Sequence, residues 1–254
     1  MEELTLNPVV SIEGEVGTGK TSLALTFPKP MVHMDTDVGG FSRASWRFAE
    51  ELKSNAIRSQ SYHVPQQAII DKLRMTTSKA GKVTGVKDLW YKMLEDYLKA
   101  LVDPAVKTIV WDSWTRVWTL CTNAFLEEKQ EKDANRVRLL EIEYTEPNLR
   151  MVSLVDAARE AGKGLVLVCH LTDERRDVPT TEGIKSITTG KRVADQWRRT
   201  GQLVDMIIRT ELNSSRPKAT ITQSKLVLDL TGMSYDEPSW SIIETAVRIL
   251  RGEG

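Results

Sequence analysis

Short apolar runs alternate along the chain with longer segments of helical periodicity. The apolar runs at 8–12, 31–34, 108–112 and 165–170 have the length and composition of strands that are buried on both faces. The last run is the clearest, because five consecutive apolar residues precede its terminal histidine. Helical segments separate these runs, and such alternation predicts a mostly parallel central sheet with helices on both faces.

The helical segments are recognised by the spacing of their apolar residues. In the segment from Asp88 to Val102, the apolar positions 89, 93, 94, 97, 98 and 101 fall on one face of a helix that Asp88 can cap. Asp103-Pro104 ends this helix. Further helices are predicted at 43–52, 66–75, 114–132, 147–161 and 238–250.

The C-terminal part of the chain is predicted to complete the sheet. Residues 203–209 form a further strand, and 219–222 with 225–230 form a closing antiparallel pair. The polar, threonine-rich segment 171–190 is predicted to be a loop, and a short helix is expected near 192–199.

These elements predict one α/β domain over residues 1–254, which is an ordinary length for such a domain. Within it, 41–107 is expected to be a variable excursion of helices and loops, and 76–85 is its most polar loop. Hydrophobic residues make up 41% of the chain and charged residues 28%, which suits a packed core and excludes global disorder.

Charge and cysteine usage narrow the class of protein. The 35 Lys and Arg residues balance the 35 Asp and Glu residues, so nucleic-acid binding would require a local basic patch. Cys121 and Cys169 are far apart and offer neither a disulfide framework nor a zinc motif. The N-terminus lacks the pattern of a secretory signal, and no apolar run approaches the length of a membrane span. We therefore expect a cytoplasmic protein.

The candidate chemistry begins where the first predicted strand ends. The run Gly14-Glu15-Val16-Gly17-Thr18-Gly19-Lys20-Thr21 fits the phosphate-binding P-loop pattern G-x-x-x-x-G-K-[ST], and a predicted helix continues from Ser22. Its glycines let backbone amides approach phosphate oxygens closely. The alternative is a glycine-rich turn that only starts a helix, but the strand before the run and the helix after it favour the P-loop. We therefore predict that residues 14–22 bind a nucleoside triphosphate.

A metal site accompanies this loop. Lys20 can reach the β- and γ-phosphates, and the Thr21 hydroxyl can bind the Mg²⁺ that bridges them. Asp112 ends the third predicted strand, where P-loop NTPases carry a carboxylate that holds the same ion. We predict a Mg²⁺ cofactor held by Thr21 and Asp112; the alternative is that Asp112 only caps a turn.

Other polar residues at strand ends are candidates for catalysis. Asp35 and Asp37 follow the second strand, where a carboxylate can orient or deprotonate an attacking water. We prefer Asp37 as this base, with Asp35 and Glu13 as alternatives, although an Asp-Thr-Asp turn can also be purely structural. His170 ends the fourth strand, where it can contact the γ-phosphate or its water; a purely structural histidine is the other interpretation.

Cations gather after His170. A basic loop in this position can bind the phosphates of single-stranded DNA, which makes 171–190 the candidate DNA-binding loop. Interleaved acidic residues leave a second interpretation open, in which the charges only keep a helix face and a loop solvated. The cations are Arg175, Arg176, Lys185, Lys191, Arg192, Arg198 and Arg199.

With these motifs located, the chain resembles the RecA-like P-loop ATPases, and among them the phage-encoded Sak-type single-strand annealing and recombination ATPases. Asp35-Thr36-Asp37 is similar to the family's strand-end acidic motif, which implies that Asp37 is the catalytic carboxylate. His170 falls on the family's phosphate-sensing residue. Ser224-Lys225 resembles the hairpin that supplies a lysine to the neighbouring subunit's nucleotide.

The resemblance implies ATP as the nucleotide and a homo-oligomer with ATP at the subunit interface. It also implies partners among phage recombination or replication proteins. The leading hypothesis is a Mg²⁺-dependent ATPase whose ATP state is coupled to a loop that binds single-stranded DNA, with Lys20, Asp37, His170 and Lys225 in catalysis. The alternative is a nucleotide-gated protein-interaction module of a replication or packaging complex without DNA contact, which the neutral net charge favours mildly. A small-molecule kinase ranks third, because no acceptor site or arginine-rich lid is evident.

Overall fold

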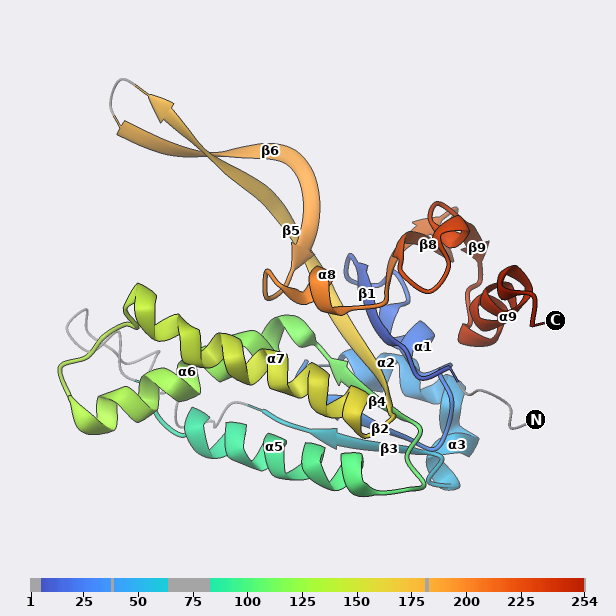
Figure 1. Cartoon of the computed structure of the whole chain (residues 1–254), viewed down its shortest axis with the longest axis horizontal. Helices are drawn as coiled ribbons and strands as arrows, with labels where there is room; N and C mark the ends of the chain where they lie inside the picture. Colours follow the sequence, from blue (N-terminus) through green and yellow to red (C-terminus); the bar gives the residue numbers. More distant parts are fainter. Residues whose placement is uncertain (1–5, 38, 64–82, 181–182, 254) are drawn as a thin grey trace.

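A computed structural model describes residues 6–37, 39–63, 83–180 and 183–253, and the structural statements below concern these residues. Within them, one sheet has the strand order β3-β2-β4-β5-β1-β7-β8-β9, and β6 pairs with β5 (Figure 1). The strands are β1 (Val9–Gly14), β2 (Met31–Asp35), β3 (Ile57–Ser61), β4 (Thr108–Asp112), β5 (Gly164–Thr180), β6 (Gly183–Asp195), β7 (Met206–Asn213), β8 (Arg216–Ser224) and β9 (Ser234–Asp236).

The strands from β3 to β7 in this order are parallel, whereas β8 and β9 are antiparallel to their neighbours. Strand β5 lies between β1 and β4, so the strand that leads into the glycine-rich run is separated from the strand that ends at Asp112. The predicted fold class, a mostly parallel sheet with helices on both faces and C-terminal antiparallel strands, is confirmed.

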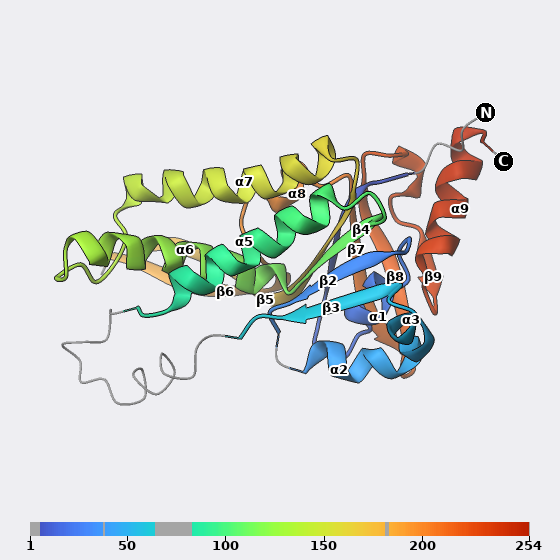
Figure 2. The same ribbon diagram turned by 90° about the horizontal axis from the view of Figure 1, so that it is seen from below.

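The helices cover the two faces of the sheet unequally. Figure 2 shows the long helices α5, α6 and α7 along one face, and the short helices α1, α2 and α3 on the other, where α9 also packs. The helices are α1 (Lys20–Ala24), α2 (Gly40–Ser45), η1 (Trp46–Phe48), α3 (Ala49–Lys53), α5 (Val86–Val102), α6 (Trp114–Lys132), η3 (Glu141–Tyr144), α7 (Thr145–Glu160), α8 (Thr200–Leu203), η4 (Leu228–Leu230) and α9 (Trp240–Arg251).

The apolar runs are continuous because both faces of the central strands are buried. In β5, Leu165 and Leu167 pack into the core beneath α5, α6 and α7, whereas Val166 and Val168 pack into the core beneath α1 and α9. Successive side chains of a strand point to opposite faces, so a strand between two helical layers needs apolar residues at every position. This pattern fixes β5 at the centre of the domain.

The segment predicted as a loop at 171–190 is instead a long antiparallel ribbon. Strands β5 and β6 pair from His170↔Asp195 to Thr180↔Gly183, and Figure 1 shows the ribbon projecting away from the body of the domain. The prediction was wrong because strand patterns are recognised by apolar alternation, and most of the ribbon's side chains are polar and exposed. The short helix expected near 192–199 is also wrong, since β6 continues to Asp195 and α8 begins at Thr200.

Two further predictions differ from the structure. Strand β8 pairs with β7 and β9, so 225–230 is not the partner of 219–222. The excursion predicted at 41–107 contains the core elements β3 and α5. Strand β3 was missed because Ile57 is its only apolar residue, as the sheet-edge position of this strand allows. The helix predicted at 66–75 and most of the loop at 76–85 lie outside the described residues.

The packing of α9 gives a test of the second core. Trp240 is almost fully buried and stacks on Phe27 with ring centroids 4.2 Å apart. We expect Trp240→Ala to lower the free energy of unfolding by about 3–5 kcal/mol, because it removes a large buried side chain and leaves a cavity. Urea denaturation would measure this loss. Ile249→Ala, on the exposed face of the same helix, should change stability by less than about 0.5 kcal/mol; equal losses for the two variants would contradict this packing.

Candidate functional site

A cavity of about 260 Å³ lies at the carboxyl edge of the parallel strands and is lined by Asp112 at the end of β4, by His170 of β5 and by the segments that follow β1 and β2. Gly14 of β1 pairs with His170 of β5, and Asp35 of β2 pairs with Asp112 of β4, so these strands end side by side. The predicted residues Lys20, Thr21, Asp37, Asp112 and His170 all line this cavity. Parallel α/β sheets bind ligands at this edge, since loops from several strands converge there.

The glycines of the loop from Gly14 to Thr21 have distinct roles. A side chain at Gly14 would collide with the Thr18 and Thr210 side chains, so the strand can only turn there without a Cβ. Gly17 and Gly19 have φ angles of 85° and 92°, in the left-handed region that favours glycine. The Thr18 hydroxyl donates to the Glu15 carbonyl oxygen at 2.9 Å, which closes the loop on itself. These contacts produce the curved backbone that a phosphate-binding loop requires.

Lys20 lies beneath this loop. Its Nζ donates to the carbonyl oxygens of Gly14 at 2.9 Å and Glu15 at 2.7 Å. Burial lowers the pKa of Lys20, and the negative charges of Asp112 and Asp37 oppose this shift. These two contacts use two of the three N–H donors of the ammonium group, which leaves one donor for a phosphate oxygen.

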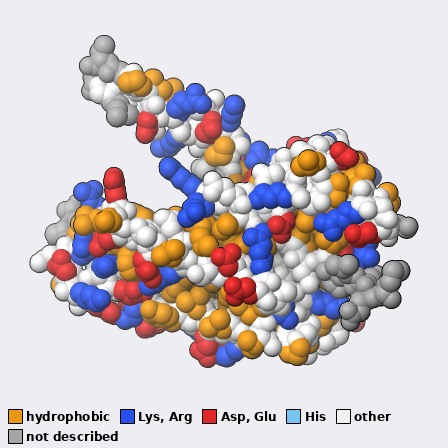
Figure 3. All heavy atoms as spheres, viewed as in Figure 1, with side chains coloured by type: hydrophobic (Ala, Val, Ile, Leu, Met, Phe, Trp, Pro, Cys, Tyr) orange, Lys and Arg blue, Asp and Glu red, His pale blue; other side chains and the backbone are white. Residues whose placement is uncertain are grey.

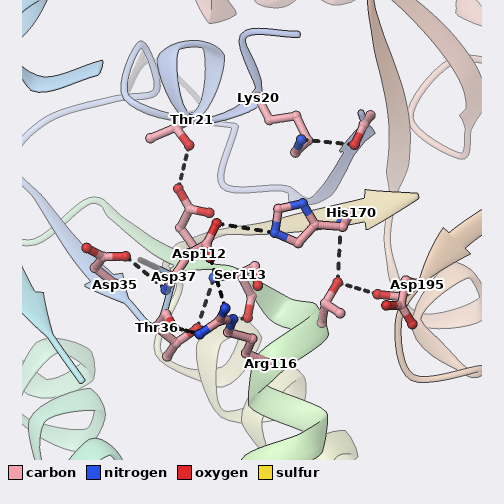
Figure 4. Close-up of polar contacts among 12 residues, drawn as sticks. Lys20, Thr21, Asp35, Thr36, Asp37, Asp112, Ser113, Arg116, His170 and Asp195 are labelled. Carbon is pink, nitrogen blue, oxygen red and sulfur yellow. Dashed lines mark hydrogen bonds and ion pairs between the residues drawn. The ribbon is translucent and has the colours of Figure 1, made fainter. Parts of the chain in front are cut away.

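Thr21 and Asp112 meet although they are distant in the sequence. The Thr21 hydroxyl donates to Asp112 Oδ2 at 2.6 Å (Figure 4). A hydroxyl and a carboxylate are the hard oxygen ligands that Mg²⁺ prefers, usually together with water and substrate phosphates. Within the described ranges, no group of three or more His, Cys, Asp and Glu side chains is placed to hold a metal by itself. The site therefore fits an ion whose other ligands come from the nucleotide and water.

His33 is a member of the site that the sequence analysis did not single out. It is fully buried in β2, with Nε2 3.4 Å from Asp112 Oδ2 and Nδ1 3.0 Å from Ser59 Oγ. Its ring also stacks on Phe41. This arrangement fixes the Asp112 carboxylate from behind. The available signal was a polar residue inside an otherwise apolar strand, although its contact with Asp112 depends on the pairing of β2 with β4.

The three acidic candidates for the catalytic base differ in where they lie relative to the cavity. Asp37 lines the cavity, and its Oδ2 lies 3.3 Å from His170 Nε2. Asp35 is buried, accepts from the Asp37 backbone amide at 3.0 Å, and has its pKa raised by burial. Glu13 is bound to Arg209 at 2.9 Å and Gln196 at 3.2 Å, and neither Asp35 nor Glu13 is part of the cavity lining. Of the three carboxylates, Asp37 is thus the one that faces the place where phosphates would lie.

Two arginines of the cavity were not anticipated. Arg43 of α2 and Arg47 of η1 line the cavity opposite the glycine-rich loop. They are four residues apart, and residues at this spacing share one face of a helix. Their guanidinium groups add positive charge that suits a polyphosphate. The spacing was visible in the sequence, but the direction of this helix face depends on how α2 packs against α1.

Lys225 lies far from this cavity. Ser224 pairs with Met206 at the start of β7, whereas the glycine-rich loop begins beside Thr210, farther along the same strand. The Lys225 ammonium group donates to the Gln202 carbonyl oxygen at 2.6 Å. Lys225 is therefore at the opposite edge of the sheet and does not reach the cavity of its own subunit.

The sheet order, the glycine-rich loop over Lys20, and the Thr21–Asp112 pair together define a P-loop NTPase. Residues 6–233 match the family described as AAA domain, and the chain belongs to this family. The match spans the glycine-rich loop, β4 and the ribbon, so the domain is of the P-loop ATPase type. A search of curated proteins found no match. Among the described residues, no helix is both long and apolar enough to cross a membrane.

The metal site can be tested through nucleotide binding. We expect Asp112→Asn to weaken Mg²⁺-nucleotide binding by about 10- to 100-fold, since a charge-assisted contact is worth about 1.5–3 kcal/mol. Binding measured with excess EDTA should change little, because the lost interaction is with the metal. Asp156→Asn, at an exposed position of α7, is the matched control. An equal loss with and without Mg²⁺ would remove Asp112 from the metal site.

Proposed function

We propose that this protein is a Mg²⁺-dependent ATPase of phage-type DNA recombination or single-strand annealing, in which the ATP state is coupled to single-stranded DNA binding. The observation that carries the proposal is the continuity of β5. The strand passes the cavity at His170 and then runs directly into the projecting ribbon. One strand thus joins the proposed ATP site to the proposed DNA-binding element.

The ribbon has properties that suit the backbone of single-stranded DNA. Its exposed strands carry Arg175, Arg176, Lys185, Lys191 and Arg192. In Figure 3, Lys and Arg side chains gather along the ribbon and near its root. A two-stranded ribbon without a core of its own is marginally stable in water, so a bound partner would stabilise it. Since the whole chain carries no net charge, attraction of phosphates would come from these individual cations and not from a net positive charge of the ribbon.

Asp37 and His170 supply the proposed link between hydrolysis and the ribbon. Asp37 would act as the base toward the attacking water, and His170 would contact the γ-phosphate or that water. Asp37 Oδ2 lies 3.3 Å from His170 Nε2, and Asp37 Oδ1 lies 3.5 Å from Arg116 Nη2. Bound Mg²⁺ would neutralise charge on the phosphates, while Lys20, Arg43 and Arg47 hold their oxygens.

A second candidate, the nucleotide-gated interaction module, is favoured by one observation. Acidic side chains alternate with the basic ones on the ribbon, among them Asp173, Glu174 and Asp177, which weakens its attraction for DNA. The same ribbon could bind a replication or packaging protein instead. DNA-dependent turnover separates the two candidates.

We expect single-stranded DNA to raise ATP turnover, and Lys20→Ala to reduce turnover by about 100-fold or more with or without DNA, because it removes the cation on the transferred phosphate. Release of inorganic phosphate would measure both effects. Lys53→Ala, at an exposed lysine of α3, should retain wild-type turnover. Turnover that ignores DNA, together with no salt-sensitive DNA binding, would favour the interaction module. If Lys20→Ala retained its turnover, the assignment of the ATP site to this cavity would be wrong.

The proposed homo-oligomer would place Lys225 against the ATP of a neighbouring subunit, and its distance from its own cavity supports such a role in trans. We expect Lys20→Ala and Lys225→Ala to be inactive alone. Mixed in equal amounts, they should recover up to about one quarter of wild-type turnover, since one interface in four combines an intact loop with an intact lysine. A mixture that stays inactive although mixed oligomers form would argue against this role.

A further inference from the structure

We infer that Arg192 is a DNA-phosphate ligand that Glu15 of the P-loop holds back, and that a bound nucleoside triphosphate releases it. This inference rests on the proposed function and names the residue pair that couples its two halves. The pair joins β6 at the root of the ribbon to the second residue of the glycine-rich loop, across 177 positions of the sequence.

The contact is bidentate. Arg192 Nε donates to Glu15 Oε1 at 2.7 Å and Nη2 donates to Glu15 Oε2 at 2.9 Å. Arg192 Nη1 donates to Asp173 Oδ1 at 2.8 Å, and Nη2 also contacts the Leu171 carbonyl oxygen at 3.2 Å. Glu15 therefore occupies the Nε–Nη2 edge of the guanidinium group, which is an edge that arginine uses to bind a phosphate through two hydrogen bonds.

The contact lies at the root of the ribbon, where Arg209 Nη1 also donates to the Arg192 carbonyl oxygen at 3.3 Å. Up to His170, β5 is paired with β1 on one side, and up to Val168 it is paired with β4 on the other. Beyond these residues, the described pairing of the ribbon is only between β5 and β6. The Glu15–Arg192 pair thus fastens the ribbon to the loop at the point where the sheet no longer supports it.

A phosphate bound at the glycine-rich loop would also affect Glu15. Its backbone carbonyl oxygen accepts from Lys20 Nζ at 2.7 Å, so a phosphate that Lys20 binds would lie close to Glu15. Phosphate oxygens then add negative charge beside the Glu15 carboxylate, and like charges repel at short range. This repulsion weakens the hold of Glu15 on Arg192. The half-exposed position of the pair makes it weak enough to open, since exposed ion pairs contribute little stability.

DNA phosphates act on the same arginine from outside. A phosphate that takes the Nε–Nη2 edge displaces Glu15, so ATP and DNA would each favour the state in which this pair is open. By linkage, ATP raises the affinity for DNA by the factor by which DNA raises the affinity for ATP. Asp173 keeps its contact with Nη1 in both states, so the switch concerns only the edge held by Glu15.

The test measures the binding of a fluorescently labelled oligothymidylate by anisotropy, without nucleotide and with a saturating non-hydrolysable ATP analogue plus Mg²⁺. In the wild type, we expect the analogue to raise DNA affinity by about 5- to 150-fold, the usual range of coupling. Glu15→Gln should raise the nucleotide-free affinity toward the analogue-bound wild-type value, and should leave less than about a twofold effect of the analogue. The measurement without nucleotide tests the switch even if the variant binds nucleotide poorly.

Arg192→Gln should change DNA affinity in the opposite direction to Glu15→Gln. It should weaken DNA binding in both states and reduce the slope of log affinity against log salt by about one, because one phosphate contact is lost. Two exposed positions serve as matched controls, Glu50→Gln and Arg58→Gln, the second of which also breaks an arginine–carboxylate pair. Both controls should behave as the wild type in every state.

The outcomes distinguish this inference from the proposed function. If the wild type binds DNA more tightly with the analogue and Glu15→Gln matches the wild type both with and without the analogue, the Glu15–Arg192 switch is wrong while the proposed function stands. A Glu15→Gln variant that binds DNA more weakly than the wild type would also overturn the switch. If the wild type binds no oligothymidylate in either state, the DNA half of the proposed function fails and the switch fails with it.

Discussion

The shared carboxyl edge of β1, β2, β4 and β5 is the constraint on which the site depends. Parallel pairing aligns the ends of these strands, with Gly14 beside His170 and Asp35 beside Asp112. Residues that are far apart in the sequence therefore face one cavity without any long loop having to place them. A shift of one pairing step would move Asp112 away from Thr21 and reverse the faces of every buried side chain in the strand.

The charged groups Lys20 and Asp112 of this edge are costly to bury, and the structure gives both of them partners. Lys20 has two carbonyl oxygens, and Asp112 has the Thr21 hydroxyl and His33. A buried charge without a partner would destabilise the fold by several kcal/mol. The same partners hold the Lys20 and Asp112 side chains at the cavity. Stability and preorganisation of the site thus have one origin.

The ribbon changes how the cavity relates to the rest of the molecule. An ordinary loop after β5 would absorb a displacement at His170 through its own flexibility. A strand that continues past the sheet transmits it, and Arg192 gives the ribbon a second attachment at Glu15 of the loop. The ATP site and the projecting element are therefore joined at two places, one on each strand of the ribbon. In the proposed function, this double attachment would couple the nucleotide state to an external partner.

The sequence by itself determined the elements whose signal is local. The buried strands appear as continuous apolar runs, α5 and α6 as periodic segments, and the glycine-rich loop as a motif in which Gly14, Gly17 and Gly19 have physical reasons to be glycine. The gathering of Lys20, Thr21, Asp37, Asp112 and His170 at one edge was expected from the P-loop motif, the ends of the predicted strands and the family resemblance, and all five line the cavity.

Only the tertiary structure decided which elements are neighbours. The ribbon and β3 escaped prediction because pairing with another strand stabilises a polar strand, and the sequence does not show that partner. His33 and Arg43 join the site for the same kind of reason, since one depends on the pairing of β2 with β4 and the other on the packing of α2. A local pattern records whether a residue is buried. Which residue it meets there is set by backbone hydrogen bonds and packing between segments far apart in the chain.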